Sequence, residues 1–263
     1  MHTRFSGLAL AAIASCRSGA TSVTEARADE ASGADGGAAV VELFTSEGCS
    51  SCPPADEVLA SLAQSADRRI YPLAFHVDYW DELGWPDRFA SRAYTTRQQA
   101  YARALGVSGV YTPQMVVGGT EEFTGSDRGH ADAALARALS HPAKVRLSIQ
   151  SRSATQDAAT VDYTVSEVPA GVVLNVAVVE HRATTSVRSG ENAGKTLRHA
   201  NVVRGFASVP LTAPTGSLTV HFAASLSRDQ AELTGFVQRE TLVDGMPVLG
   251  AARAPLAGVV VGR

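Results

Sequence analysis

Hydrophobic and polar positions change their spacing near the middle of this chain. Up to about residue 140, short apolar runs alternate with longer segments whose apolar residues recur at helical intervals. The runs predict strands over residues 40–45, 70–77, 115–117 and 120–124, and the helical stripes predict helices over 54–66, 87–105 and 128–140. The pattern therefore predicts an α/β unit with the element order β-α-β-α-β-β-α.

A second hydrophobic–polar pattern begins after His141 and Pro142, which end the last predicted helix. Apolar and polar residues now alternate in short segments separated by glycine, proline, serine and asparagine, as in half-buried strands. Strands are predicted over residues 144–150, 160–165, 172–181, 218–224 and 233–238. The polar segment 190–204 is predicted to be a long connection between strands, with contact to the first unit as the alternative. This spacing favours a β-sandwich-like domain over residues 143–263.

The most informative chemistry in the chain is a pair of cysteines that follows the first predicted strand. Cys49 and Cys52 form a Cys-x-x-Cys motif where the first predicted helix begins. A strand that delivers two cysteines to a helix N-terminus is typical of thioredoxin-like folds, in which the helix dipole favours a reactive thiolate. Residues 39–142 are therefore expected to be a thioredoxin-like domain. Pro53 and Pro54 remove backbone donors, so the helix is expected to start either at Cys49 or closer to Cys52.

Cysteine usage supports a redox function for this pair. The chain contains three cysteines, and Cys16 lies in the N-terminal leader. A disulfide within the folded body must therefore join Cys49 to Cys52, and so short a ring stabilises a fold little compared with a long loop. Exchange with other thiols requires the two sulfurs to be open to solvent.

Thr112 and Pro113 are the second element of the predicted catalytic site. In thioredoxin-like folds such a pair precedes the third core strand with a cis peptide bond, which places backbone beside the cysteines. Five further side chains are predicted as accessory residues: Glu42, His76, Asp78, Trp80 and Asp81. Glu42 is a proton acceptor in this interpretation, and His76 is a proton partner or a metal ligand. The structural alternatives are strand-end, helix-capping and packing roles.

The N-terminal residues predict export. Arg4 precedes an apolar run over residues 5–14, as in a secretory signal, and residues 1–28 are interpreted as the leader. The leader ends either at Cys16, in a lipobox-like sequence that would receive a lipid anchor, or at Ala28 after a small-x-small site. Both ends place the protein in the periplasm or outside the cell, with residues 29–38 as a flexible tether. The chain has no apolar run long enough to span a membrane, and its net charge of -3 argues against a nucleic-acid partner.

With these residues in view, the chain resembles a family called domain of unknown function 1223 (DUF1223), whose members are exported bacterial proteins with a thioredoxin-like half. The matching segments are VELFTSEGCSSCPPAD at 41–56, HVDYWD at 76–81, YTPQ at 111–114, GEN at 190–192, NVVR at 201–204 and VLGA at 248–251. The resemblance implies a fold and a location rather than a reaction.

These observations predict a thiol–disulfide oxidoreductase that acts outside the cytoplasm on protein thiols or disulfides, or on a redox partner protein. The Cys49–Cys52 disulfide is its redox group, and no other cofactor is expected. One alternative is a metal-binding protein in which Cys49, Cys52 and His76 hold Cu(I), an ion that soft ligands suit. Another is a non-enzymatic binding module with an inert disulfide. The redox direction, the substrate and the oligomeric state are not set by the sequence.

Overall fold

The computed structural model describes residues 1–3, 36–240 and 245–257. Residues 4–28 of the predicted leader, including Cys16, and residues 29–35 of the predicted tether lie outside the described residues. Strands make up 42% of the described part and helices 21%. No helix of this part is long and apolar enough to cross a membrane.

The first part of the chain forms the elements that its pattern predicts, with small shifts at their ends. Their bounds are β1 Ala39–Thr45, α1 Pro53–Ala63, β2 Ile70–His76, η1 Asp78–Leu83, α2 Arg92–Leu105, β3 Gln114–Val117, β4 Glu121–Thr124 and α3 Arg128–Leu139. Helix α2 begins five residues later than predicted, because the chain first makes the short 3-10 helix η1 and the Ser91 hydroxyl then accepts from the Ala93 N–H. Gly106 ends α2 with a positive φ of 68°, a conformation that glycine adopts readily at helix ends.

The second part is made of long strands. Their bounds are β5 Leu147–Ala154, β6 Ala158–Val165, β7 Val172–Ser186, β8 Thr196–Pro210, β9 Thr215–His221, β10 Ala231–Arg239 and β11 Val248–Pro255, with a short 3-10 helix η2 at Arg228–Gln230. Segment 190–204, predicted as a connection, is in fact the tip of the β7–β8 hairpin followed by the first half of β8. Strands β7 and β8 have 15 residues each, well above the usual length.

Strands from both parts share one sheet, and this makes the predicted fold class wrong. A mixed eight-stranded sheet has the order β11-β10-β7-β8-β2-β1-β3-β4, and a separate sheet has the order β5-β6-β9. Strand β2 is parallel to β8 through the pair Ala74–Val202. The protein is therefore not a thioredoxin-like α/β domain followed by a β-sandwich. At the edge that β2 would expose in a separate domain, β8 pairs at this one position and the Asn201 amide donates to the Pro72 carbonyl over 2.9 Å.

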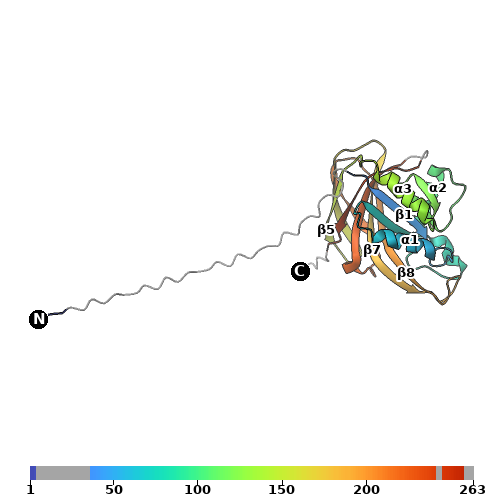
Figure 1. Cartoon of the computed structure of the whole chain (residues 1–263), viewed down its shortest axis with the longest axis horizontal. Coiled ribbons are helices and arrows are strands. Elements are labelled where there is room, and N and C mark those ends of the chain that lie inside the picture. Colours follow the sequence, from blue (N-terminus) through green and yellow to red (C-terminus); the bar gives the residue numbers. More distant parts are fainter. Residues whose placement is uncertain (4–35, 241–244, 258–263) are drawn as a thin grey trace.

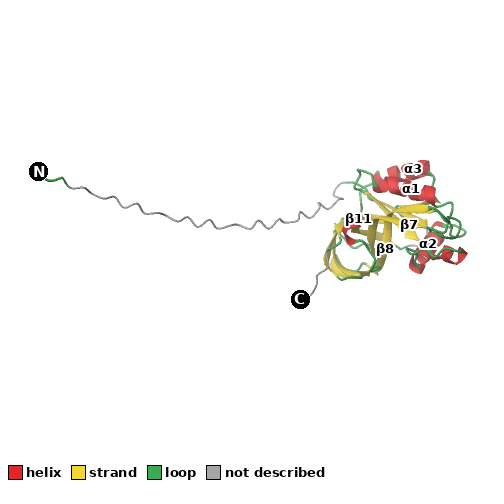
Figure 2. Ribbon diagram, turned by 90° about the horizontal axis from the view of Figure 1, so that it is seen from below, coloured by secondary structure: helices red, strands yellow, loops and turns green. Residues whose placement is uncertain are grey.

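Each face of the large sheet has its own apolar core. Alternate residues of β1 divide between the faces: Val41 and Leu43 pack under α1 and α3, whereas Val40 and Phe44 pack toward α2. The three-stranded sheet covers β7, β10 and β11 and encloses a third core. Figure 1 shows the helices gathered at one end of the molecule, and Figure 2 shows α1 and α3 on the side of the sheet opposite α2.

A buried charge joins the two parts of the chain on the α2 side. The Arg97 guanidinium donates to both carboxylate oxygens of Glu42 on β1 and, over 3.0 Å, to Gln238 Oε1 on β10. Tyr101 also donates to Glu42, and Gln238 Nε2 donates to the Tyr101 hydroxyl over 2.8 Å. Four rings surround the guanidinium with centres 4.9 to 5.7 Å away, those of Phe75, Tyr101, Phe206 and Phe236. Glu42 therefore neutralises a structural cation.

Candidate functional site

Cys49 and Cys52 form a disulfide at the edge of the large sheet where β1 ends. Their Cα atoms are 5.4 Å apart, and the turn between them is closed by the Cys52 N–H, which donates to the Cys49 carbonyl over 3.2 Å. Cys52 is the N-cap of α1, which starts at Pro53. The helix therefore begins at the second cysteine.

The prolines leave few free backbone donors at this helix end. Pro53 and Pro54 have no N–H, and the Ala55 and Asp56 N–H groups both donate to the Cys52 carbonyl. A thiolate at Cys49 would lie one turn before the helix and would gain less from its dipole than the motif suggests.

Both cysteines are completely buried, with exposed fractions of 0%, whereas Ser50 and Ser51 between them are exposed. The expectation of a disulfide open to solvent is therefore wrong for this structure. Part of the cover comes from the tip of the β7–β8 hairpin, residues 187–195. Asn192 in this tip donates to the Cys49 carbonyl over 2.9 Å. The alternative that segment 190–204 contacts the first unit is thus confirmed.

The predicted Thr112–Pro113 element lies next to the same site, and its peptide bond is cis, as predicted. The Trp80 indole donates to the Thr112 hydroxyl over 2.8 Å. Gly125 lies between this element and α1. A Cβ atom on Gly125 would be 3.5 Å from Pro113 Cβ and 3.1 Å from Ala55 Cβ in the first turn of α1. Trp80 also packs against Gly48, directly before the first cysteine. Trp80, Thr112 and Pro113 are therefore brought to the disulfide.

Asp56 places a carboxyl group behind the disulfide, and the sequence analysis did not identify it. It follows Cys52 by four residues in α1, so the two side chains share one helix face. The Thr45 hydroxyl donates to its Oδ1 over 2.9 Å. Burial raises the pKa of Asp56, against the opposing attraction of His199 and His76. A carboxyl group of this kind can hold or release a proton nearer neutral pH than an exposed one.

A buried group of two acids and two histidines lies beside Asp56. We call Glu47, His76, Asp87 and His199 the acid–histidine cluster. The His76 ring donates from Nδ1 to Asp87 Oδ2 over 2.6 Å, and the His199 ring donates from Nε2 to Glu47 Oε1 over 3.1 Å. The two histidine rings are edge to face with centres 5.0 Å apart. His76 Nε2 and His199 Nδ1 have no partner among the described residues.

Three members of the cluster have pKa values that differ from their ordinary values. Burial alone lowers the pKa of His76, but the Asp87 carboxylate outweighs burial and the pKa is raised overall. Burial alone raises the pKa of Asp87, and His76 reverses this and lowers it. Burial likewise opposes the hydrogen bonds from His199 and Trp85, and the pKa of Glu47 is lowered overall. The His76–Asp87 pair is therefore a buried ion pair.

We predict that stability depends on pH through this ion pair. His76, raised above its ordinary pKa of 6.5, stabilises the fold fully below pH 6.5 and loses this contribution as the pH rises through its folded value. Asp87, lowered below 3.8, stabilises the fold above pH 3.8 and loses this contribution as the pH falls through its folded value. The contribution is thus greatest between these two pH values.

Thermal unfolding between pH 3 and pH 9 checks this prediction. We expect His76→Gln to remove a fall in Tm of a few °C on the alkaline side, because glutamine does not titrate. His221→Gln, at an exposed histidine of β9, is the matched control and should keep the wild-type profile. An unchanged profile in His76→Gln would contradict the assignment.

Three predicted accessory residues have structural partners. Glu42 points to the α2 side and pairs with Arg97. Asp78 accepts from the Thr95 hydroxyl over 2.5 Å and so ties η1 to α2. Asp81 accepts from the Asp87 N–H over 3.0 Å within a turn. Asp81 acts on the site through Asp87, whereas no described contact of Glu42 or Asp78 is with the cysteines.

Glu47, Asp87 and His199 are site residues that the sequence analysis missed. Glu47 lies two residues before Cys49, and no separate sequence signal assigned it a role beside the cysteines. Asp87 was assigned to a helix that starts later. His199 is in β8, which reads as a polar connection because its buried positions alternate with exposed ones. The alternation at Leu197, His199 and Asn201 was the available signal.

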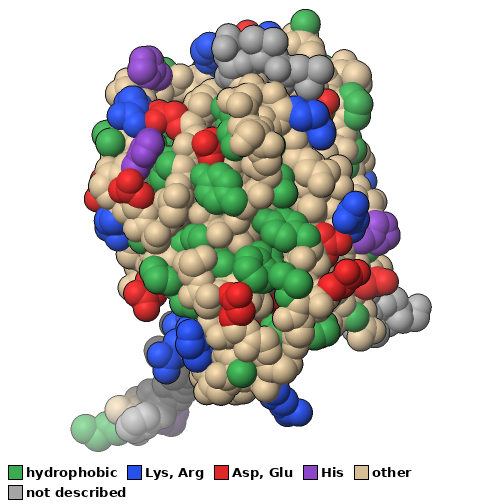
Figure 3. Space-filling view, turned by 90° about the vertical axis from the view of Figure 1, so that its right-hand side faces the viewer, with side chains coloured by type: hydrophobic (Ala, Val, Ile, Leu, Met, Phe, Trp, Pro, Cys, Tyr) green, Lys and Arg blue, Asp and Glu red, His purple; other side chains and the backbone are tan. Residues whose placement is uncertain are grey.

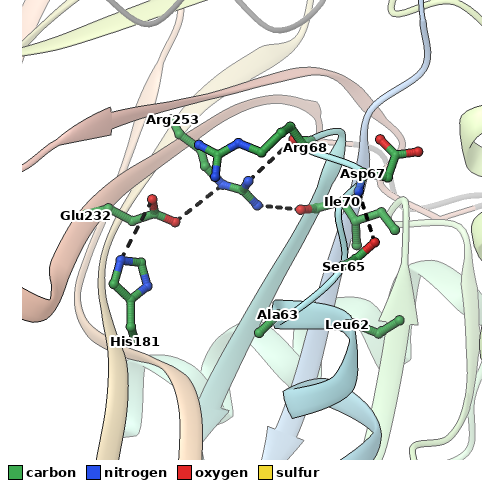
Figure 4. A pocket seen from close by; sticks show the side chains of 9 residues that line it. All are labelled: Leu62, Ala63, Ser65, Asp67, Arg68, Ile70, His181, Glu232 and Arg253. Carbon is green, nitrogen blue, oxygen red and sulfur yellow. Dashed lines mark hydrogen bonds and ion pairs between the residues drawn. The ribbon is translucent and has the colours of Figure 1, made fainter.

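Neither a metal centre nor the polar hollow in Figure 4 competes with this site. No group of three metal-binding side chains is found among residues 1–3, 36–240 and 245–257. The hollow lies at the C-terminal end of α1, away from the cysteines. Within it Glu232 pairs with Arg253 over 3.3 Å and with His181 over 4.0 Å, so its charges are matched internally. Its lining residues are Leu62, Ala63, Ser65, Asp67, Arg68, Ile70, His181, Glu232 and Arg253.

Comparisons with known proteins give a family and two similar structures. The family model described as "Protein of unknown function (DUF1223)" matches residues 40–238. The crystal structure of protein AGR_C_4864 from Agrobacterium tumefaciens is 30% identical, with a TM-score of 0.60, and the match covers 86% of this chain and 97% of that chain.

HBP35 of Porphyromonas gingivalis is 15% identical, with a TM-score of 0.62, covering 88% of this chain and 79% of that chain. At this identity it shares the fold alone. No curated protein matches. The family model covers the disulfide and the hairpin tip. The chain therefore belongs to the DUF1223 family.

Proposed function

We propose that this protein is a thiol–disulfide oxidoreductase that exchanges its Cys49–Cys52 disulfide with protein thiols. The observation that carries the proposal is the disulfide at the start of α1 with the Asp56 carboxyl group on the same helix face. A short-ring disulfide adds little stability, and a half-buried carboxyl group on the same helix face is not needed for packing. Both features fit a pair that changes its redox state.

In the direction that reduces the pair, the substrate is a protein dithiol. Its first thiolate attacks Cys49 Sγ, a new disulfide bond forms there, and the bond to Cys52 Sγ breaks. The Cys52 thiolate takes a proton, for which Asp56 is the nearby donor. The second substrate thiolate then attacks the mixed disulfide and releases Cys49. Two electrons pass from the dithiol to the pair, and the same steps in reverse oxidise the pair.

The proposal places the protein outside the cytoplasm. The apolar run over residues 5–14 and the cleavage sites at Cys16 and Ala28 support export, and disulfides persist in exported compartments. The partner is then an exported protein or a redox protein that regenerates the pair. Trp80, Trp85 and the exposed Leu83 lie in the segment beside the disulfide and offer apolar contacts to such a partner. Figure 3 shows apolar side chains gathered in the middle of this end of the molecule.

Redox equilibration of the purified protein in glutathione buffers tests the proposal. We expect reversible reduction with the fold retained and a potential between about −270 and −120 mV, the range of known exchange proteins. In the same assay Asp56→Asn should slow exchange at least about 10-fold and flatten its pH profile, because the proton donor is lost. A potential below about −300 mV would identify an inert structural disulfide instead.

A further inference from the structure

Three hydrogen bonds join the hairpin tip of residues 187–195 to the cysteine turn, and a fourth supports Asn192 within the tip. Asn192, with an exposed fraction of 0%, donates to the carbonyls of Glu47 and Cys49 over 2.9 Å each. Its own carbonyl accepts from the Lys195 ammonium over 2.9 Å. The Glu191 carboxylate accepts from the Ser50 N–H, also over 2.9 Å. The tip thus satisfies backbone groups on both sides of Cys49.

Val187 at the base of the tip is buried, and the rest of the tip is held by polar contacts. Asn192 is the only buried residue between positions 188 and 196. Gly190 and Gly194, with φ of 76° and 81°, flank it in a conformation that favours glycine. Segments with few buried apolar contacts open at low free energy, even when neighbouring strands do not. The 15-residue strands β7 and β8 can therefore stay in place while the tip moves.

The burial of the cysteines conflicts with any exchange reaction unless a cover moves. A thiolate must approach a sulfur in line with the breaking bond, and neither cysteine has exposed surface. Ser50 and Glu191, which join the turn to the tip, are both exposed to solvent. The tip contacts the cysteine turn through Asn192 and Glu191, so its movement would free backbone groups on both sides of Cys49.

We infer that residues 187–195 form a displaceable lid over the Cys49–Cys52 disulfide, latched by Asn192 and Glu191. This inference rests on the proposed exchange function. The lid excludes small thiols in the closed state. A protein substrate opens it by offering its own backbone groups to the Ser50 N–H and the Cys49 carbonyl. The second part of the chain thereby controls access to the cysteines of the first.

The rate at which dithiothreitol reduces the disulfide tests the lid directly. Reduced cysteines are alkylated at timed intervals and counted by mass spectrometry. We expect Asn192→Ala to be reduced about 10-fold faster than wild type, because two hydrogen bonds of the latch are lost. Ala193→Ser, at the exposed neighbouring position, is the matched control and should keep the wild-type rate.

Each result decides for or against the lid. Equal rates for Asn192→Ala and wild type overturn it, whether both are slow or both fast. If Asn192→Ala does not fold, Glu191→Gln decides, because this exposed carboxylate contacts only the turn and should give a several-fold faster rate. A variant that dithiothreitol reduces faster, but that still exchanges with no protein thiol, keeps the lid and removes the proposed function.

Discussion

Cys52→Ser is expected to stop turnover and to trap a substrate on Cys49. The serine hydroxyl cannot attack the mixed disulfide, so the bond between Cys49 and the substrate persists. Turnover should fall to the background rate, and a covalent adduct of one substrate per protein should accumulate. Non-reducing gels of the variant, incubated with an oxidised protein substrate after reduction, measure the adduct. Mass spectrometry then locates the bond.

Cys49→Ser provides the matched control for this experiment. Cys52 caps α1, with Asp56 on its helix face. We therefore expect Cys49→Ser to lose turnover without accumulating an adduct. Combining Cys52→Ser with Asn192→Ala should raise the rate of trapping if the lid limits access. Failure of Cys52→Ser to capture any substrate, with the lid opened in this way, would contradict the proposed function.

Arg97→Met is expected to cause the largest loss of stability of any single change considered. It leaves the Glu42 carboxylate buried without its cation, beneath the rings that surround Arg97. Removing one partner of a buried ion pair typically costs about 3–5 kcal/mol. The Glu42 carboxylate strongly raises the pKa of Arg97 despite the opposing effect of burial, so the guanidinium stays charged throughout the accessible pH range. Urea unfolding at pH 7 measures the change.

Two further variants show whether the buried charge is the cause. Glu42→Gln combined with Arg97→Met removes both charges and should recover much of the lost stability. Arg137→Met breaks an exposed pair with Glu121, whose side chains are 55% and 32% exposed, and should leave the urea midpoint nearly unchanged. Equal losses in Arg97→Met and the double variant would show that packing, and not charge, is responsible.

The elements of the first part could be predicted because their periodicity is local. Strand β1 and helix α1 lie within a few residues of their predicted bounds, and the cis bond before Pro113 was also predicted. The fold class could not, because it depends on β8. That strand pairs with β7 along its length and meets β2 at only one residue pair, so its sequence alternates and reads as a polar connection. Missing it separated two parts that share one sheet.

The candidate site was predicted in part for the same reason. Cys49, Cys52 and the Thr112–Pro113 pair carry local signals, and the structure brings them together. His199 and Asn192 reach the site from more than 140 positions away, through a hairpin whose length no local pattern reveals. Glu42 has the polarity and the strand position of a proton acceptor, yet strand alternation turns it to the α2 face.

The sequence by itself determined the disulfide partners, most elements of the first part and the family. These depend on residue type and on spacing within a few turns or strands. Only the tertiary structure decided that one sheet runs through both parts and that the cysteines are buried. It also decided that Asn192 donates to the Glu47 and Cys49 carbonyls. Each of these depends on contacts between distant segments, which form because paired strands and buried polar groups must find hydrogen-bond partners wherever the fold provides them.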